Sequence, residues 1–199
     1  AKTPWGHTRP DYGRPEVRQY IRDNAVMWLD EYRVDGLRWD MTAYIRQVDG
    51  QPSNPDGQFP EAWEMMRWIH REILDRFPWK VTIAEEFRND PATTTDVEQG
   101  GAGFSSQWDD EFVHPVRELL ITPDDRARDM EKLRSAILHR FGDDVFHRVI
   151  YTESHDEVAN GRARVPEEMA PDETYGWHAK KRSTLGAALV FTAPGIPMI

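Results

Sequence analysis

The chain contains no cysteine, which excludes a disulfide scaffold and a metal site built on thiolates. It has no apolar run close to the ~20 residues that a membrane-spanning helix requires. Lysine and arginine number 25 and aspartate and glutamate 35, which gives a formal net charge of −10. Such an acidic balance argues against binding to nucleic acid or to an anionic membrane surface. We therefore expect neither as a partner.

Helical and extended segments alternate along the 199 residues. Long stretches carry apolar residues at helical spacing, and short apolar runs with strand character lie between them. The expected helices span residues 14–32, 61–77, 111–120, 123–140 and 177–191. The expected strands span residues 34–40, 80–85, 104–108, 145–153 and 195–199. This alternation predicts an α/β fold with a parallel sheet and helical crossovers.

The sequence also predicts which residues two of the helices bury and where a third helix begins. The first should bury one face, and the second should bury Ala62, Met66, Ile69, Ile73 and Phe77. Thr122 is expected to cap the helix at 123–140, with Pro123 at its first position. The residues expected on the buried face of the first helix are Val17, Tyr20, Ile21, Trp28, Leu29 and Tyr32.

Three expected strands end in acidic residues: Asp40, Glu85 and Asp156. The carboxyl ends of parallel strands meet at one rim of an α/β fold, where active sites form. Alternation along the first strand places Arg38 and Asp40 on one face, and we expect the arginine to keep the carboxylate charged. A charged, fixed carboxylate is suited to act as a nucleophile at a sugar carbon.

The other two strand ends supply different groups. Glu85 follows an apolar run, so partial burial beside other carboxylates should raise its pKa and suit it to be a general acid. His155 precedes Asp156, and both can face a site only where the strand ends. Each group alone is more typical of a salt bridge, a solvated rim or a polar loop. Their joint occurrence at the ends of predicted strands favours a catalytic role.

These segments resemble the signature blocks of the α-amylase superfamily, glycoside hydrolase family 13. The stretch from Val34 to Asp40 resembles the second block, Thr82 to Glu86 the third, and Ser154 to Glu157 the fourth. The third and fourth look most like those of 1,4-α-glucan branching enzymes, as does the segment from Tyr12 to Val17. The resemblance implies a partial (β/α)8 barrel, about strands four to eight. Residues 1–199 would be the C-terminal part of the catalytic barrel domain.

The resemblance also implies a mechanism for an α-1,4-glucan such as glycogen, starch or a maltooligosaccharide. Asp40 would be the nucleophile of a retaining double displacement, and Glu85 the general acid and base. Asp156 would stabilise the transition state. Arg38 and His155 would be the substrate-binding residues, with His155 at hydroxyls of the sugar ring and Arg38 holding Asp40 charged and oriented. Retaining chemistry places the two carboxyls ~5–5.5 Å apart. No cofactor and no metal are implied, and a cytoplasmic enzyme of glycogen biosynthesis is expected.

The chain departs from the family pattern in several places. The first block, with an Asn-His pair on an earlier strand, is absent, as are the N- and C-terminal β-domains of branching enzymes. Trp39 is bulkier than the family's usual residue, and residues 162–172 match neither branching enzymes nor amylases clearly. We expect the chain to be a piece of a longer enzyme, and Trp39, Trp108 and Trp177 to pack in cores.

Three alternatives remain open. An α-amylase-type hydrolase would use the same residues with water as the acceptor. An enolase-type barrel enzyme would bind Mg²⁺ through acidic residues on strand ends, although the separations between Asp40, Glu85 and Asp156 do not fit three consecutive strands. The isolated chain would be inactive, since five strands of an eight-stranded barrel leave two open edges that also permit self-association.

Overall fold

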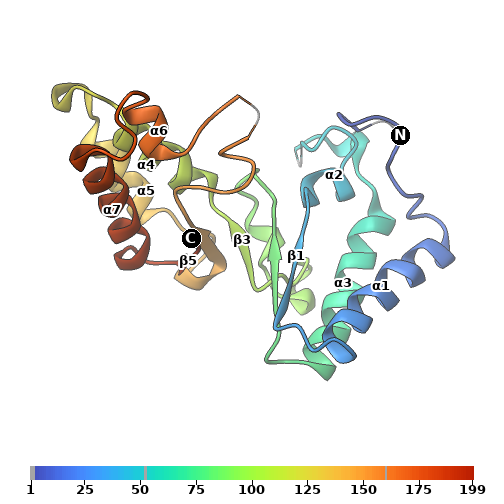
Figure 1. The fold of residues 1–199 in the computed structure, drawn as a ribbon. Coiled ribbons are helices and arrows are strands. Elements are labelled where there is room, and N and C mark those ends of the chain that lie inside the picture. The colour runs from blue at the N-terminus through green and yellow to red at the C-terminus, as the bar shows by residue number, and fades with distance from the viewer. Residues whose placement is uncertain (1–2, 52, 160) are drawn as a thin grey trace. The chain divides into compact units, whose positions relative to one another are not determined.

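The computed structural model describes residues 3–51, 53–159 and 161–199. The chain divides into two compact units, Ala1–Trp108 and Asp109–Ile199, and each is described by itself. Strands in both units pair in parallel and alternate with helices (Figure 1), which confirms the expected α/β class. In the part of the chain that the structure describes, no helix is long and apolar enough to cross a bilayer.

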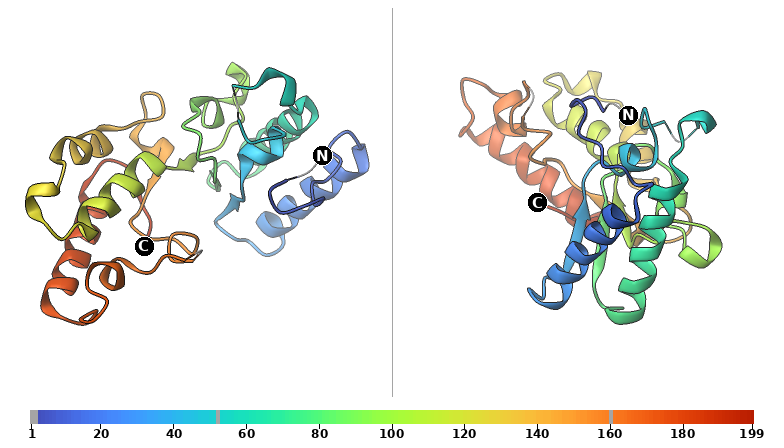
Figure 2. Two further views of the ribbon diagram at one scale, coloured as in Figure 1. Left: turned by 90° about the horizontal axis from the view of Figure 1, so that it is seen from above. Right: turned by 90° about the vertical axis from the view of Figure 1, so that its right-hand side faces the viewer.

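The first unit contains three parallel strands, with β2 paired to both β1 and β3. Its helices α1 and α3 contact each other and lie side by side in Figures 1 and 2. The elements are α1 (Pro15–Asp30), β1 (Gly36–Trp39), α2 (Thr42–Arg46), α3 (Pro60–Arg76), β2 (Val81–Ala84) and β3 (Ser106–Trp108), with 3₁₀ turns at Pro55–Gly57, Pro91–Thr93 and Val97–Gln99.

The core of the first unit lies among α1, α3 and the strands. All five residues expected on the inner face of α3 are buried, and Pro60 starts the helix at its first position. The expectation for α1 is wrong in part. Ala25 and Leu29 are buried, but Tyr20 is 73% and Tyr32 62% exposed. Apolar aromatic residues at helical spacing therefore overstate the width of the buried face of α1.

A histidine is enclosed in this core. His70 of α3 lies 4.1 Å from Phe104 and 5.4 Å from Trp39, measured between ring centres. Burial disfavours its charged form and lowers the pKa of His70 from 6.5 to about 4, although the main chain at Ala102 and Met66 acts in the opposite direction. His70 is therefore neutral in the folded protein near pH 7.

Acidification should destabilise the protein through His70. The unfolded chain binds a proton at this ring near pH 6.5 and the folded chain only near pH 4. Unfolding therefore takes up a proton between these pH values, and the free energy of unfolding falls as pH is lowered from 6.5 to 4, by on the order of 3 kcal/mol. Urea unfolding at several pH values measures this loss. His70→Phe should flatten the dependence in this window, and an unchanged slope would contradict the assignment.

The second unit contains two parallel strands, β4 and β5, and four α-helices among its described residues. A buried cluster that includes Phe112, Ile150 and Val190 joins α4, β4 and α7. The elements are α4 (Asp110–Ile121), α5 (Met130–Leu138), β4 (Arg148–Ile150), α6 (Val165–Met169), α7 (Trp177–Thr192) and β5 (Ile196–Pro197), with 3₁₀ turns at Asp125–Ala127 and Val145–His147.

Two sequence expectations for this unit are corrected. Thr122 does not cap a helix at 123–140, because it ends α4 and its hydroxyl donates to Glu118 O at 2.7 Å. Asp129 caps the later helix α5 instead, accepting from the amides of Glu131 and Lys132. The strand expected at 145–153 shortens to Arg148–Ile150 because Asp144 caps a 3₁₀ turn before it.

Candidate functional site

The first strand brings Arg38 and Asp40 together as alternation predicts. Arg38 Nη1 donates to Asp40 Oδ1 at 3.0 Å, while Leu37 and Trp39 pack on the core. The Asp40 side chain is 76% exposed, so this carboxylate is open to a ligand. The guanidinium of Arg38 also stacks on the ring of Trp108 at 4.3 Å, which restricts its orientation.

The same arginine joins Asp40 to Glu85. Arg38 Nη2 lies 2.5 Å from Glu85 Oε2, and the Glu85 side chain is only 2% exposed. Glu85 follows β2, and its amide donates to Trp39 O at 3.0 Å, which continues the β1–β2 pairing past the end of the strand. Two of the expected catalytic carboxylates therefore share one guanidinium.

The surroundings of Glu85 shift the pKa of its carboxyl group. Burial has the largest effect and raises the pKa of Glu85 above its ordinary value. A hydrogen bond from the Met41 amide and the charge of Arg38 act in the opposite direction, and Asp40 raises it further. The direction agrees with the sequence prediction, and it favours a carboxyl that retains its proton as a general acid would.

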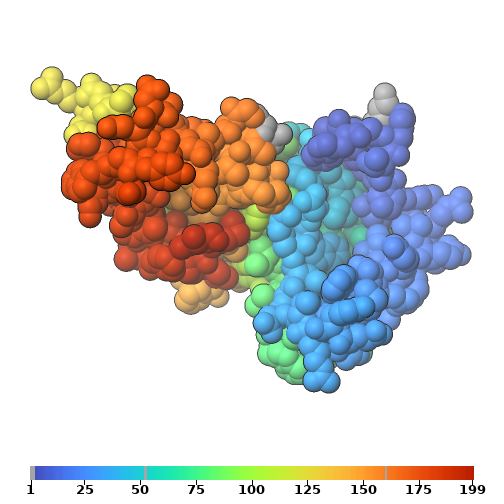
Figure 3. All heavy atoms as spheres, viewed as in Figure 1, coloured from blue at the N-terminus to red at the C-terminus, as the bar shows by residue number. Residues whose placement is uncertain are grey.

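His155 and Asp156 lie in the second unit, in the turn that follows β4. Both side chains are exposed, and His155 Nε2 lies 3.2 Å from Asp156 Oδ2. The atoms of the segment after β4, coloured orange, are visible on the surface of this unit in Figure 3. The strand has ended before His155, so strand alternation no longer forces the two side chains to opposite faces.

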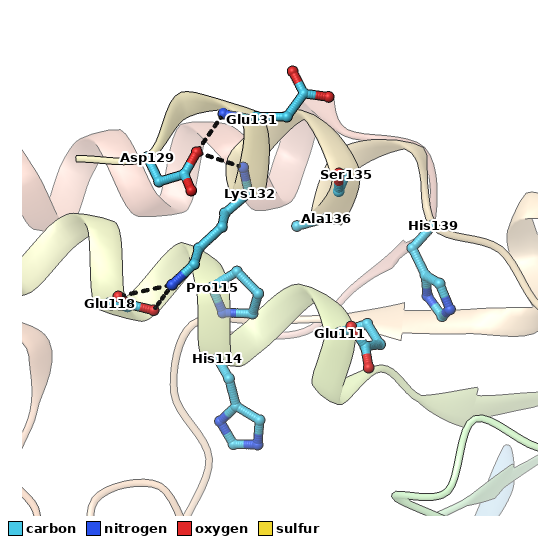
Figure 4. A pocket seen from close by; sticks show the side chains of 10 residues that line it. All are labelled: Glu111, His114, Pro115, Glu118, Asp129, Glu131, Lys132, Ser135, Ala136 and His139. Carbon is cyan, nitrogen blue, oxygen red and sulfur yellow. Dashed lines mark hydrogen bonds and ion pairs between the residues drawn. The ribbon is translucent and has the colours of Figure 1, made fainter.

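The second unit also has a pocket. It has a volume of about 520 Å³ and lies between α4 and α5, where Lys132 bridges to Glu118 at 3.1 Å (Figure 4). None of the predicted site residues lines it. Its lining residues are Glu111, His114, Pro115, Glu118, Asp129, Glu131, Lys132, Ser135, Ala136 and His139.

The tryptophans divide between core and surface. Trp108 is buried and Trp39 packs in the core of the first unit, as expected. Trp177 is 67% exposed, so core packing was the wrong expectation for this residue. It opens α7, where its ring lies 5.8 Å from Lys181 Nζ and contacts His178 edge to face.

Sequence reasoning missed most of the residues that hold Glu85 in place. The Met41 amide donates to Glu85 Oε2 at 2.9 Å, and Thr42 donates to the Glu85 carbonyl from its amide and its hydroxyl. The next glutamate, Glu86, is buried and pairs with Arg46. No capping signal marks the short helix α2, so only the position of Thr42, two residues after Asp40, could have drawn attention to it.

No known family profile matches the chain. A 1,4-alpha-glucan branching enzyme of Pseudoalteromonas atlantica is 30% identical over 96% of this chain and 26% of its own length. One from Xanthomonas oryzae is 31% identical over 96% of this chain and 27% of its own. The chain is a homologue of branching enzymes in glycoside hydrolase family 13.

Solved structures agree on the fold of this branching-enzyme homologue. An Anoxybacillus α-amylase matches 94% of the chain and 35% of its own with a TM-score of 0.65 at 20% identity. A pullulanase complexed with maltotetraose matches 94% and 26% of the two chains with a TM-score of 0.61 at 21% identity. These likenesses confirm the fold expected of part of a (β/α)8 barrel. The chain spans about a quarter of the length of the curated relatives named above.

Proposed function

We propose that this chain supplies the catalytic carboxylates of a retaining α-glucan-active enzyme, and that the enzyme is a 1,4-α-glucan branching enzyme of glycogen biosynthesis. Residues 1–199 would form the C-terminal part of its catalytic barrel domain. The observation that carries the proposal is the shared guanidinium of Arg38, which contacts both an exposed Asp40 and a buried Glu85. The names of the relatives support the choice of reaction.

The first step breaks an α-1,4 linkage. Asp40 attacks the anomeric carbon, and the bond to the leaving oxygen breaks as Glu85 transfers its proton to that oxygen. The product is a glycosyl ester on Asp40 and a shortened glucan with a free hydroxyl. Arg38 orients Asp40 and stabilises its charge, while burial raises the pKa of Glu85 and so favours the protonated form that a general acid requires.

The second step transfers the glycosyl group. Glu85, now ionised, accepts a proton from the acceptor hydroxyl, which attacks the anomeric carbon and releases Asp40. With the 6-hydroxyl of a glucan as the acceptor, the product is a branch, and with water it is a hydrolysed chain. Asp156 would stabilise the oxocarbenium-like transition state and His155 would bind a sugar hydroxyl. A cytoplasmic location belongs to the same proposal and is tested by fractionating the source cells.

Incubation with amylose separates branching from hydrolysis. A branching enzyme should lower iodine staining and create α-1,6 linkages, seen as new anomeric signals by ¹H NMR, without raising the number of reducing ends. A steady rise in reducing ends with no α-1,6 signal would instead support the amylase-type hydrolase. Activity lost to a chelator and restored by Mg²⁺ would favour the enolase-type alternative, so a chelator control accompanies the assay.

A further inference from the structure

The residue that follows Asp40 has an uncommon backbone. Met41 has φ 44° and ψ 52°, the left-handed conformation that side chains other than glycine rarely adopt. This conformation aims the Met41 amide at Glu85 Oε2, 2.9 Å away. Such a backbone persists only where its surroundings hold it. The contact that links the two catalytic segments therefore depends on whatever fixes the start of α2.

Helix α2 is too short to be stable without contacts to other parts of the unit. It has five residues, Thr42–Arg46, and no side-chain cap hydrogen bond at its start. At its first residue, the Thr42 amide donates to the Glu85 carbonyl at 2.9 Å, and the Thr42 hydroxyl lies 2.6 Å from Glu86 Oε2. The start of α2 is thus tied to both glutamates.

The other end of α2 is joined to Glu86 by an ion pair. Arg46 is the last residue of the helix, its side chain is 6% exposed, and it pairs with Glu86, whose side chain is 1% exposed. Arg46 Nη1 also pairs with Asp90 Oδ2 at 2.7 Å, and the guanidinium lies 5.1 Å from the centre of the Trp63 ring. Glu86 therefore receives one contact from each end of α2.

We propose that Arg46 is a positioning residue for the general acid: its pair with Glu86 and Asp90 holds α2 in the orientation that keeps the Met41 amide on Glu85. The proposal rests on the assignment of Glu85 as the acid. Arg46 acts through this chain of contacts, because its guanidinium pairs with Glu86 and Asp90, whereas Glu85 pairs with Arg38.

A double variant tests the proposal in the full-length enzyme. Arg46→Met with Glu86→Gln removes both charges of the buried pair and leaves the net charge unchanged. Asp90 loses its partner in this variant, but its side chain is 19% exposed and reaches solvent. We expect kcat to fall ~10- to 100-fold with KM within ~2-fold, since a displaced acid slows the chemistry more than binding. A ¹³C NMR titration of labelled glutamate carboxyls, assigned with Glu85→Gln, should show a raised pKa for Glu85, because the Met41 hydrogen bond that lowers it is lost.

A matched control removes an ion pair between two other helices of the same unit. Arg22→Met with Glu72→Gln breaks the pair that joins α1 to α3, and it should leave kcat and the titration of Glu85 unchanged. Thr42→Val, which removes only one hydroxyl, serves if the double variant does not fold, and should shift both readouts in the same direction by a smaller amount.

The outcomes separate this proposal from the proposed function. A folded double variant with the kcat and the Glu85 titration of the parent would overturn the role of Arg46, as would Thr42→Val with no change in either. An unmodified enzyme that does not act on α-glucan would overturn the proposed function, while the NMR titration would still report whether α2 holds the Met41 amide on Glu85.

Discussion

Asp40→Asn should reduce turnover of α-1,4-glucan by the full-length enzyme ~10⁴-fold or more, because an amide cannot form the glycosyl ester on which the double displacement depends. The side chain is nearly isosteric and 76% exposed, so the free energy of unfolding should change little. Iodine staining of amylose and urea unfolding measure the two properties on the same preparation.

The control for this variant is another aspartate next to β1. Asp35→Asn changes a fully exposed carboxylate whose nearest cation is Lys80 Nζ at 3.7 Å, and it should keep parental activity. If Asp40→Asn retained a tenth or more of the parental activity, or if both variants lost activity equally, Asp40 would not be the nucleophile.

Glu85→Gln should lose ~10²- to 10⁴-fold in activity on glucan, the range that general acid and base catalysis supplies. The loss should depend on the leaving group. An α-glycosyl fluoride releases fluoride without needing a proton from the enzyme, so formation of the glycosyl ester from this substrate should be nearly unaffected. Fluoride release in the first turnover, measured with an ion-selective electrode, separates this step from the later transfer.

Glu98→Gln is the matched control, since Glu98 is an exposed glutamate of the same unit that pairs with Arg71 at 3.4 Å. It should act on both substrates as the parent does. Equal losses of Glu85→Gln on glucan and on the fluoride would mean that Glu85 supports the fold or the binding of sugar and does not donate the proton.

The sequence predicted the elements whose local signals agree with their packing. Helix α3 has a regular apolar face, and all five residues expected on that face are buried in the structure. The start of α5 was predicted wrongly because Thr122-Pro123 has the composition of a helix start, while the Asp129 cap lies further along the chain. Helix α2 was missed because a left-handed Met41 carries no sequence signal, and because the residues that hold this helix lie far along the chain.

The candidate site likewise contains contacts that the sequence predicted and contacts that it could not. Strand alternation predicted the Arg38–Asp40 contact, because it depends only on residues two apart. The contact from Arg38 to Glu85 crosses 47 residues of sequence and follows from the β1–β2 register, which sequence periodicity does not provide. His155 and Asp156 lie at the end of a shortened strand in the other unit, so their convergence with Asp40 stays a prediction.

Trapping the glycosyl-enzyme tests the central claim most directly. The Glu85→Gln variant of the full-length enzyme, supplied with an α-maltosyl fluoride, should form the ester and then stall, because no base activates the acceptor. Peptide mass spectrometry should find the added glycosyl mass on the peptide that contains Asp40. Added mass on a different carboxylate, or release of fluoride with no glycosylated peptide, would contradict the account.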